Sequence, residues 1–386
     1  MYKIKKLNAI SDIVKTHLTQ DSYEISEDAQ NPQGILVRSA SMHGYDVNDN
    51  LLCVARAGAG YNNIPYSEFA EKGIVVFNTP GANANGVKEL VICGMLLASR
   101  DIYGGISWAE QLKGQNEIDK TVEKGKKNFA GGEIACKSLG IIGMGAIGAL
   151  VANAAVALDM EVTGYDPFMT VESALSLSRS VSRGASTDVI FANSDFITLH
   201  LPLMEATKHT INKKSLAKCK DGVVILNFAR GELVDTDAIL EALESGKVSK
   251  YVTDFPDEKL LGVKNVISIP HLGASTKESE ENCAEMAAKQ IKDYIENGNI
   301  TNSVNYPDCS QPRSGQYRLG IMHKNITNMV GQITQKIADE NHNISNMINK
   351  SRGDLAYTLI DLDDSPSDVC VSSLEQIDGI IKVRSL

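Results

Sequence analysis

The chain has 386 residues, which is more than one hydrophobic core usually supports, so we expect two or three domains. Hydrophobic residues make up 43% and charged residues 22%, as in ordinary globular proteins. The formal net charge of −10 argues against nucleic acid or an anionic membrane as a partner, because both need a broad basic surface. The longest apolar stretch, residues 89–99, is too short to span a bilayer.

Two further features predict a cytoplasmic protein. The first ten residues lack the apolar core and the small-residue cleavage site of a signal peptide. The seven cysteines are odd in number and form no C-x-x-C pair, which favours reduced, mostly buried thiols over disulfides or zinc ligands. We therefore expect no metal site.

Short apolar runs alternate with helical patterns along most of the chain, which is typical of parallel β–α–β units. Three buried strands are predicted first, at 34–39, 51–55 and 73–77. A long helix follows over about 85–100, and then an exposed, charged stretch over 113–127. A second series of strands is predicted at 138–142, 161–165, 196–199, 222–227, 250–254 and 266–269.

The last part of the chain has a pattern of its own. Residues 299–315 hold two prolines and little periodicity, which is typical of a linker. Residues 316–386 follow the order strand, helix, two strands, helix, strand, and about 70 residues can fold alone. The predicted fold class is therefore α/β, with two Rossmann-like lobes and a small α+β domain.

Between the predicted strand 138–142 and an alanine-rich helical segment lies a glycine loop, Gly143-Met144-Gly145-Ala146-Ile147-Gly148. A G-x-G-x-x-G pattern alone is a weak signal, but this strand–loop–helix context is the one that binds a dinucleotide. Gly143 permits the tight turn, Gly145 lets the backbone approach a pyrophosphate, and Gly148 lets the helix lie close to the strand. The helix N-terminus adds free N–H groups for the phosphates.

The strand 161–165 ends at Asp166, eighteen residues past Gly148. A carboxylate there accepts hydrogen bonds from ribose hydroxyls and repels a 2′-phosphate, which favours NAD over NADP. The alternative is a solvated turn residue before Pro167. Because no G-x-x-x-x-G-K-[ST] loop is present, a nucleotide triphosphatase is disfavoured, and we predict NAD as the cofactor.

Three kinds of polar residue follow later strands: Arg230, the acids of 254–258, and His271. Because ligands bind outside the carboxyl ends of the strands in open α/β sheets, these side chains should converge. Histidine suits the removal of an alcohol proton near neutral pH, a carboxylate on its other nitrogen fixes its tautomer, and arginine holds an anion through paired donors. Singly, each is more often a structural hydrogen-bonder; together, after a dinucleotide loop, they favour oxidation of a 2-hydroxy acid.

Over residues 35–305 the sequence resembles the D-isomer-specific 2-hydroxyacid dehydrogenases. The segments that carry the resemblance are 56–60, 77–81, 143–148, 199–203, 227–235 and 271–276. The resemblance implies that Arg230 binds substrate, that His271 is the acid/base, and that a glutamate pairs with His271. The family pattern D-V-[F/Y]-x-x-E-P places this glutamate five residues past the aspartate. In this chain Glu258 stands four residues past Asp254, so Glu258 is the expected partner and Asp257 the alternative.

The resemblance also implies domains and contacts. Residues 1–92 and 275–305 would form the substrate-binding domain, and residues 93–274 the NAD-binding domain. The backbone N–H groups of Gly58, Ala59 and Gly60 would hold the substrate carboxylate. The residues expected to line the cofactor are Thr79, Gly143, Gly145, Ala146, Ile147, Gly148, Asp166, Phe228, Ala229, Asp254 and Ala274.

Within the family, residues 56–60 and 270–276 are most similar to members that oxidise 3-phospho-D-glycerate to 3-phosphohydroxypyruvate with NAD, the first step of L-serine biosynthesis. Arg38 and Arg56 are then candidates to hold the substrate phosphate, because a guanidinium fork suits that group. The alternative for each arginine is a surface salt bridge.

Residues 316–386 resemble the ACT domain, a regulatory module that binds amino acids. His323, Asn325 and Asn343 match positions that bind serine in regulated family members, whereas Asn328-Met329 replaces the usual proline and glycine. The alternative is that the domain only mediates oligomerisation. We expect a homodimer or homotetramer, a small-molecule substrate and L-serine as an effector.

Two other functions stay open at this point. One is a different D-2-hydroxyacid dehydrogenase, such as a hydroxypyruvate or glyoxylate reductase. The other is a non-catalytic NAD sensor similar to the C-terminal-binding corepressors, which share this fold. The joint presence of Arg230, Glu258 and His271 favours a catalytically active enzyme over a non-catalytic sensor.

Overall fold

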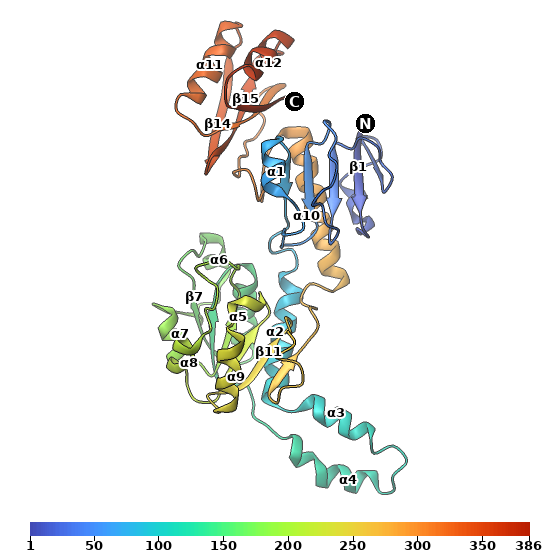
Figure 1. The fold of residues 1–386 in the computed structure, drawn as a ribbon, viewed down its shortest axis with the longest axis vertical. Coiled ribbons are helices and arrows are strands. Elements are labelled where there is room, and N and C mark those ends of the chain that lie inside the picture. The colour runs from blue at the N-terminus through green and yellow to red at the C-terminus, as the bar shows by residue number, and fades with distance from the viewer. The chain divides into compact units, whose positions relative to one another are not determined.

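The computed structural model describes the backbone of residues 1–386 and every side chain except that of Glu172. The chain divides into two compact units (Figure 1). Unit 1 holds residues 1–83 and 280–386, and unit 2 holds residues 84–279. The C-terminal part of the chain therefore groups with the N-terminal part, and the boundaries of the three expected domains stay a prediction.

Unit 2 contains a seven-stranded parallel sheet in the order β12-β11-β10-β9-β6-β7-β8. Its strands are β6 (Ser138–Ile142), β7 (Glu161–Tyr165), β8 (Ser182–Arg183), β9 (Phe196–Leu199), β10 (Val223–Asn227), β11 (Val248–Thr253) and β12 (Val266–Ser268). Its helices are α2 (Ala84–Ser99), α3 (Ile102–Glu110), α4 (Ile118–Gly125), α5 (Ala146–Ala157), α6 (Val171–Ser176), α7 (Thr187–Asn193), α8 (Lys213–Lys218) and α9 (Thr236–Glu244). The strand order reverses between β6 and β9, and such a switch point is where open α/β sheets bind ligands.

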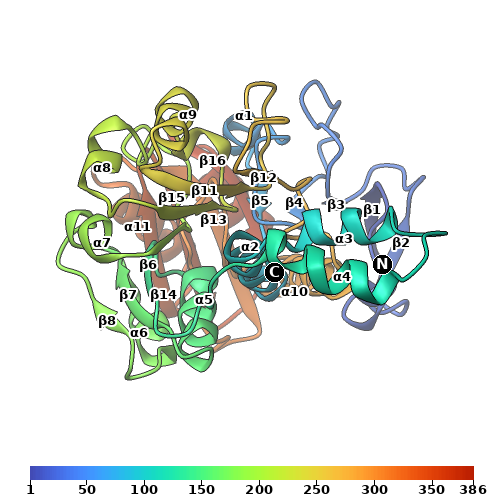
Figure 2. The same ribbon diagram turned by 90° about the horizontal axis from the view of Figure 1, so that it is seen from below.

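Helices cover both faces of this sheet (Figures 1 and 2). One buried apolar cluster joins α2 and α5 to the sheet through residues such as Val91 and Val151. Another joins α7, α8 and α9 to it through Ile190, Leu216 and Ile239. Since β9 and β10 are buried along their whole length, their sequences are continuous apolar runs rather than alternating ones. That burial leaves the carboxyl edge of the sheet as the place for polar chemistry.

Unit 1 contains a five-stranded parallel sheet in the order β2-β1-β3-β4-β5. Its strands are β1 (Tyr2–Leu7), β2 (Tyr23–Ser26), β3 (Gly34–Val37), β4 (Cys53–Arg56) and β5 (Val75–Phe77). Ala287 and Ile291 of helix α10 (Lys277–Asn297) belong to the apolar cluster on one face. Phe69 of helix α1 (Tyr66–Glu71) belongs to the cluster on the other face.

The tail, residues 316–386, forms a four-stranded antiparallel sheet in the order β14-β15-β13-β16. Its elements are β13 (Tyr317–Lys324), α11 (Met329–Asp339), β14 (Ile344–Arg352), β15 (Leu355–Leu362), α12 (Asp368–Glu375) and β16 (Ile380–Ser385). Both helices pack on one face of this sheet through Ile333 and Leu374. The other face contributes Met322, Tyr357 and Leu359 to the cluster that contains α10. The tail sheet is therefore covered on both sides.

Two arginines of the tail bind the C-terminal end of α10. The Arg384 guanidinium donates to the carbonyls of Tyr294 (3.2 Å) and Ile295 (3.1 Å) and lies 4.6 Å from the centre of the Tyr294 ring. Arg318 donates to the carbonyl of Asn297 at 3.0 Å. These carbonyls belong to the last turn of the helix and lie at the negative end of its dipole, so the cations stabilise the helix end. The same bonds fasten the tail to the rest of unit 1.

Arg318 is also half of a fully buried ion pair with Asp361. Ser314 donates its backbone N–H (3.0 Å) and its hydroxyl (2.8 Å) to the same carboxylate. Burial alone would raise the pKa of Asp361, but the bonds from Arg318 and Ser314 outweigh it and hold the pKa below its usual value. A buried pair is tolerated here because nearly every donor and acceptor has a partner.

The fold class and the element order agree with the sequence-based expectation. Every strand predicted from an apolar run is present with its ends within two residues, and so is the long helix α2. The short or exposed strands β1, β2 and β8 were not predicted. The expected linker is not a loose connection: Ile300 and Cys309 are paired backbone to backbone and Tyr306 is fully buried. Five of the seven cysteines are buried, as expected, and the other two, Cys93 and Cys136, are exposed.

Among the described residues, no single helix is both long and apolar enough to cross a membrane, although the bent pair α2 and α3 meets the length and composition test jointly.

Replacing Asp361 with asparagine should destabilise the tail, because it leaves the Arg318 cation buried without its counter-charge. We expect the free energy of unfolding to fall by about 3–5 kcal/mol in chemical denaturation. A lowered pKa means that Asp361 contributes stability at neutral pH and that this contribution disappears as the pH falls through the lowered value. The Asp361→Asn protein should therefore lose less stability than the wild type below about pH 4. Equal stability of the two proteins at pH 7 would contradict this role.

Candidate active site

The glycine loop joins β6 to α5, and its three glycines have three different surroundings. Gly143 has a φ of +97°, and a Cβ there would lie 2.4 Å from the carbonyl oxygen of His200. A Cβ on Gly148 would lie 2.0 Å from the carbonyl oxygen of Gly143. Gly145 has nothing within 4 Å of its Cβ position. The first and third glycines are therefore required by the fold, whereas the second leaves space for a ligand.

The N-terminus of α5 is suited to a phosphate group. Gly145 is its N-cap and supplies no side-chain hydrogen bond, so the first N–H groups of Ala146, Ile147 and Gly148 have no capping side chain. Free N–H groups and the positive end of the helix dipole together bind anions. The residues present fit the pyrophosphate of a dinucleotide.

Asp166 lies where the sequence predicted, directly after β7. One carboxylate oxygen accepts the N–H of Met144 and the other accepts the N–H of Phe168, both at 2.8 Å. The carboxylate thus ties the glycine loop to the end of β7. Each oxygen keeps a further lone pair, and the side chain is half-buried, so it can still accept ribose hydroxyls.

Arg230 is presented by a short loop after β10. The buried side chain of Asn227 donates to the Arg230 carbonyl at 2.8 Å and accepts the N–H of Ala229 at 3.2 Å. Phe228 is buried against α2, where a Cβ on Gly94 would lie 2.9 Å from its ring. The half-buried Arg230 side chain donates one bond, to the Ala229 carbonyl at 2.6 Å. Asn227 was not predicted as a functional residue; a polar residue closing an apolar strand was the available signal.

His271 follows β12 and is exposed, with its ring centre 4.5 Å from that of Phe255. Asp254, directly after β11, is 1% exposed, and neither of its oxygens has a hydrogen-bond partner by strict geometry among the described residues. Burial raises the pKa of the Asp254 carboxyl, and the nearby His271 and Arg230 oppose that rise. Arg230, Asp254 and His271 therefore interact electrostatically. Ala274 lies one residue past Gly273, whose Cβ position is 3.4 Å from Asp254 Oδ2.

The two candidate partners of His271 lie differently. Asp257 accepts the hydroxyl of Thr236 at 3.0 Å and the N–H of Leu260 at 3.1 Å. Glu258 is exposed and makes no hydrogen bond or ion pair with any residue that the structure describes. Asp257 is thus engaged in holding the loop after β11, while Glu258 is available. The pairing of Glu258 with His271 stays a prediction.

His200 was missed by the sequence reasoning. It follows β9, beside the glycine loop, and Thr198 Oγ1 lies 3.1 Å from its Nε2. Its Nδ1 is buried and has no partner among the described residues. Burial lowers the pKa of His200 to about 3, so the ring is neutral at physiological pH. A histidine directly after a strand that neighbours the glycine-loop strand was the signal available.

The loop 58–60, expected to hold the substrate carboxylate and called the substrate loop below, lies in unit 1. Thr79 N donates to the Gly58 carbonyl at 3.1 Å, and Asn78 Nδ2 donates to the Ala59 carbonyl at 2.6 Å. The N–H groups of Ala59 and Gly60 donate to no residue that the structure describes. The Gly58 N–H, by contrast, donates to the Arg56 carbonyl at 2.9 Å, so it is not one of the free donors that the sequence led us to expect. The N–H groups of Ala59 and Gly60 stay free for an anion. Thr79 itself is fully buried.

The two candidate phosphate ligands also lie in unit 1. Arg38 forms a salt bridge with Glu280 at 2.8 Å, which is the alternative to a phosphate ligand. Both side chains are partly exposed. The Arg56 side chain donates to the Arg38 carbonyl at 3.1 Å and lies directly over Gly58. Arg56 thus lies at the substrate loop, and Arg38 would have to share its guanidinium with Glu280.

The three expected serine ligands do not meet within one tail. His323 is 2% exposed, and its ring nitrogens lie 2.9 Å from the Lys324 carbonyl and 2.8 Å from Thr358 Oγ1. Asn325 donates to the Gly353 carbonyl, near the same end of the sheet. Asn343 donates to Asp363 and precedes the first residue of β14, at the opposite end.

Comparisons with known proteins agree with this geometry. Residues 95–273 match the NAD-binding domain of the D-isomer specific 2-hydroxyacid dehydrogenases. The chain is 34% identical over 369 residues to the D-3-phosphoglycerate dehydrogenase of Methanocaldococcus jannaschii, covering 93% of this chain and 67% of that protein. It is 37% identical over 295 residues to the hydroxypyruvate reductase of Thermotoga maritima, covering 73% of this chain and 90% of that protein. The chain belongs to the D-isomer-specific 2-hydroxyacid dehydrogenase family.

A solved member of this family supports the same assignment. The NAD+-bound 3-phosphoglycerate dehydrogenase of Entamoeba histolytica superposes with a TM-score of 0.61 at 27% identity, covering 79% of this chain and 98% of that chain. The chain spans about 56–67% of the length of the first curated phosphoglycerate dehydrogenases that it matches. Family membership confirms the predicted enzyme class and the predicted cofactor, NAD. It does not test the ACT resemblance.

Substituting Gly145 with alanine should separate cofactor binding from folding. The methyl group meets no protein atom, so stability should change by less than about 1 kcal/mol. It occupies the space that a pyrophosphate needs, so the Kd for NAD should rise by about tenfold or more, measured by calorimetry. Gly132→Ala is the matched control, because its Cβ position is equally open. An unchanged Kd in Gly145→Ala would remove the loop from the cofactor site.

Proposed function

We propose that the chain is a D-3-phosphoglycerate dehydrogenase, which oxidises 3-phospho-D-glycerate with NAD. The observation that carries the proposal is the register of three neighbouring strands. Asn227 of β10 pairs with Thr253 of β11, and Thr253 pairs with Ser268 of β12. Arg230, Asp254 and His271 follow these three residues at the carboxyl edge of the sheet, the same edge at which the glycine loop follows β6.

We propose a role for each group. NAD, held by the glycine loop and Asp166, would supply the acceptor for the hydride that leaves C2 of the hydroxy acid. His271, exposed beside Phe255, takes the hydroxyl proton, and neutral imidazole is the suitable base near pH 7. Arg230 donates to the hydroxyl oxygen and the substrate carboxylate through its remaining N–H groups, which stabilises the charge that develops as a carbonyl forms. The free N–H groups of Ala59 and Gly60 hold the substrate carboxylate, and Arg56 and Arg38 are the candidate ligands of its phosphate.

The substrate is tested by an NADH absorbance assay over a panel of D-hydroxy acids and their keto partners, with and without L-serine. We expect the highest kcat/KM with 3-phospho-D-glycerate and 3-phosphohydroxypyruvate. The second candidate is a hydroxypyruvate reductase, because the 37%-identical Thermotoga maritima protein carries that name and is covered over 90% of its length. A preference for unphosphorylated hydroxypyruvate would select it and refute our proposal.

Removing the base should abolish turnover but spare the cofactor. His271→Asn should lower kcat by about 10²–10⁴-fold, because it removes the imidazole that takes the hydroxyl proton. The Kd for NAD should stay within about twofold, since His271 follows β12, which lies four strands along the sheet from β6 and its glycine loop. His209→Asn, an exposed histidine of the same unit, is the control. Turnover that survives His271→Asn would refute the role assigned to it.

Arg230→Lys tests the anion clamp. Lysine keeps the charge but lacks the paired planar donors, so kcat/KM should fall by roughly 10- to 100-fold. Lys259→Arg is the control. Lys259 pairs with Asp237 on the surface, so this exchange should leave kcat/KM unchanged. Undiminished kcat/KM in Arg230→Lys would contradict the clamp.

Comparing Glu258→Gln with Asp257→Asn identifies the acid that pairs with His271. A partner carboxylate raises the basicity of histidine, so its loss should shift the acidic limb of the kcat/KM pH profile to lower pH. We expect this shift in Glu258→Gln. Asp257→Asn should instead loosen the loop after β11 and lower thermal stability without moving the limb. The opposite pattern would transfer the role to Asp257.

We further propose L-serine as an effector, a homodimer or homotetramer as the assembly, and a cytoplasmic location. Since Asn325 and Asn343 lie at opposite ends of one tail sheet, a serine that contacts both needs two tails side by side, which supports an oligomer. Asn343→Ala should relieve inhibition by L-serine at least about fivefold in its inhibition constant, while Gln335→Ala on α11 should not. Inhibition by serine that is unchanged in Asn343→Ala would refute this site.

A further inference from the structure

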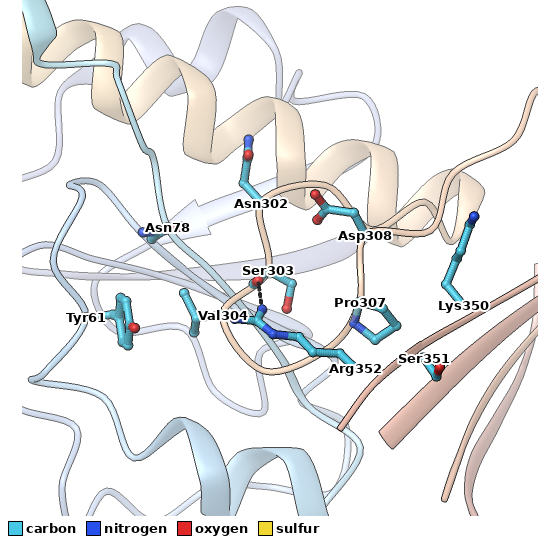
Figure 3. Close-up of a pocket in the computed structure, with 10 residues that line it drawn as sticks. All are labelled: Tyr61, Asn78, Asn302, Ser303, Val304, Pro307, Asp308, Lys350, Ser351 and Arg352. Atoms are coloured by element: carbon cyan, nitrogen blue, oxygen red, sulfur yellow. Dashed lines mark hydrogen bonds between the residues drawn. The ribbon is translucent and has the colours of Figure 1, made fainter. Parts of the chain in front are cut away.

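Unit 1 contains a cavity of about 530 Å³ that no expected site accounts for (Figure 3). Its walls are strand β14 of the tail, the loop 302–308 that precedes the tail, and Tyr61 and Asn78 beside the substrate loop. In Figure 3, Arg352 extends from the tail toward the centre of the loop 302–308, and Tyr61 lies on the far side of it. The cavity therefore lies between the tail and the segment that carries the substrate loop.

The charges at this cavity favour an anion. Lys350 and Arg352 line it from β14, and Asp308 is the one acid among its lining residues. Lys350 forms no hydrogen bond or ion pair with any described residue, and Arg352 donates only to a neutral carbonyl, that of Ser303, at 2.9 Å. In a chain of net charge −10, two cations without carboxylate partners make a local positive site. The Tyr61 hydroxyl and the Asn78 amide add further hydrogen-bonding groups to the walls.

The cavity wall is connected to the substrate loop by hydrogen bonds. Ser303 forms a β-bridge with Phe77, and Val304 N donates to the Val76 carbonyl at 2.9 Å. The next residue of that strand end, Asn78, donates from its side chain to the Ala59 carbonyl at 2.6 Å. These contacts link Arg352, through Ser303 and β5, to the loop 58–60.

We propose that this cavity binds a small anion, a phosphate or a carboxylate, between Lys350 and Arg352, and that its occupancy changes how the loop 58–60 holds substrate. An anion draws the Arg352 guanidinium toward itself, because a charged acceptor forms a stronger bond than the neutral carbonyl of Ser303. The effect on substrate rests on the proposed function, whereas the binding of an anion does not.

Binding is tested first, by calorimetry on the full chain with inorganic phosphate in one arm and malonate in the other, at constant ionic strength. We expect one site per chain in the wild type, and the arm with the lower Kd identifies phosphate or carboxylate as the source of the ligand. Lys350→Gln removes no described hydrogen bond, so it should fold normally and weaken binding about tenfold. Arg352→Gln should weaken it at least as much, and Lys336→Gln on α11 should have no effect. Absence of binding to the wild type, or a Kd in both cavity variants that equals the wild-type Kd, would overturn the proposal.

The coupling is tested by the KM for 3-phosphoglycerate as the stronger-binding anion is titrated. We expect KM to change about fivefold in the wild type and in Lys336→Gln, but not in Lys350→Gln, while the KM for NAD stays constant. Anion binding without any change in KM would refute the coupling. An enzyme inactive on every hydroxy acid would instead refute the proposed function, and the calorimetric result would still decide the anion site.

Discussion

The close approach of Gly148 to the carbonyl oxygen of Gly143 is the constraint on which unit 2 depends. A Cβ at Gly148 would lie 2.0 Å from that oxygen, so any side chain would separate α5 from the end of β6. Glycine there brings the helix N-terminus to the switch point of the sheet, where its free N–H groups and its dipole favour phosphate. Because β10, β11 and β12 run parallel to β6, the residues that follow them, Arg230, Asp254 and His271, lie at the same edge of the sheet. The close contact between Gly148 and the Gly143 carbonyl therefore determines where the cofactor loop lies.

Unit 1 depends on a different kind of contact, between cations and a helix end. Arg384 and Arg318 of the tail satisfy the last carbonyls of α10, and the buried Asp361 carboxylate compensates the Arg318 charge. Both faces of the tail sheet are consequently covered, one by its own helices and the other by the cluster around α10. Because the tail is held in this way, anion binding at its edge strand β14 would act on the neighbouring loop 302–308 rather than shift the whole tail. This fixed attachment supports the proposed coupling through Arg352 and Ser303.

Apolar periodicity and glycine spacing were sufficient to predict the buried strands, the cofactor loop and the strand ends that carry Arg230 and His271, because burial on both faces leaves a strong pattern. The short edge strands β2 and β8 and the partly exposed strand β1 lack that pattern. The packed state of residues 299–315 was also hidden, because Tyr306 and Asn305 are held by residues more than 200 positions away in sequence. Asn227 and His200 were missed for a different reason: the hydrogen bonds of Asn227 to the Arg230 loop and the burial of His200 beside the glycine loop appear only in the folded chain. The positive cavity at Lys350 and Arg352 could not be predicted either, because it forms only where the tail packs against the loop 302–308.

The central claim is that a hydride moves directly from C2 of 3-phospho-D-glycerate to NAD at the edge formed by β10, β11 and β12. It is tested most directly with substrate deuterated at C2 and mass spectrometry of the products. The account predicts one deuterium in the nicotinamide ring of the reduced cofactor, none in solvent water, and no transfer in His271→Asn. Deuterium in the water, or transfer that is equally fast without His271, would contradict it.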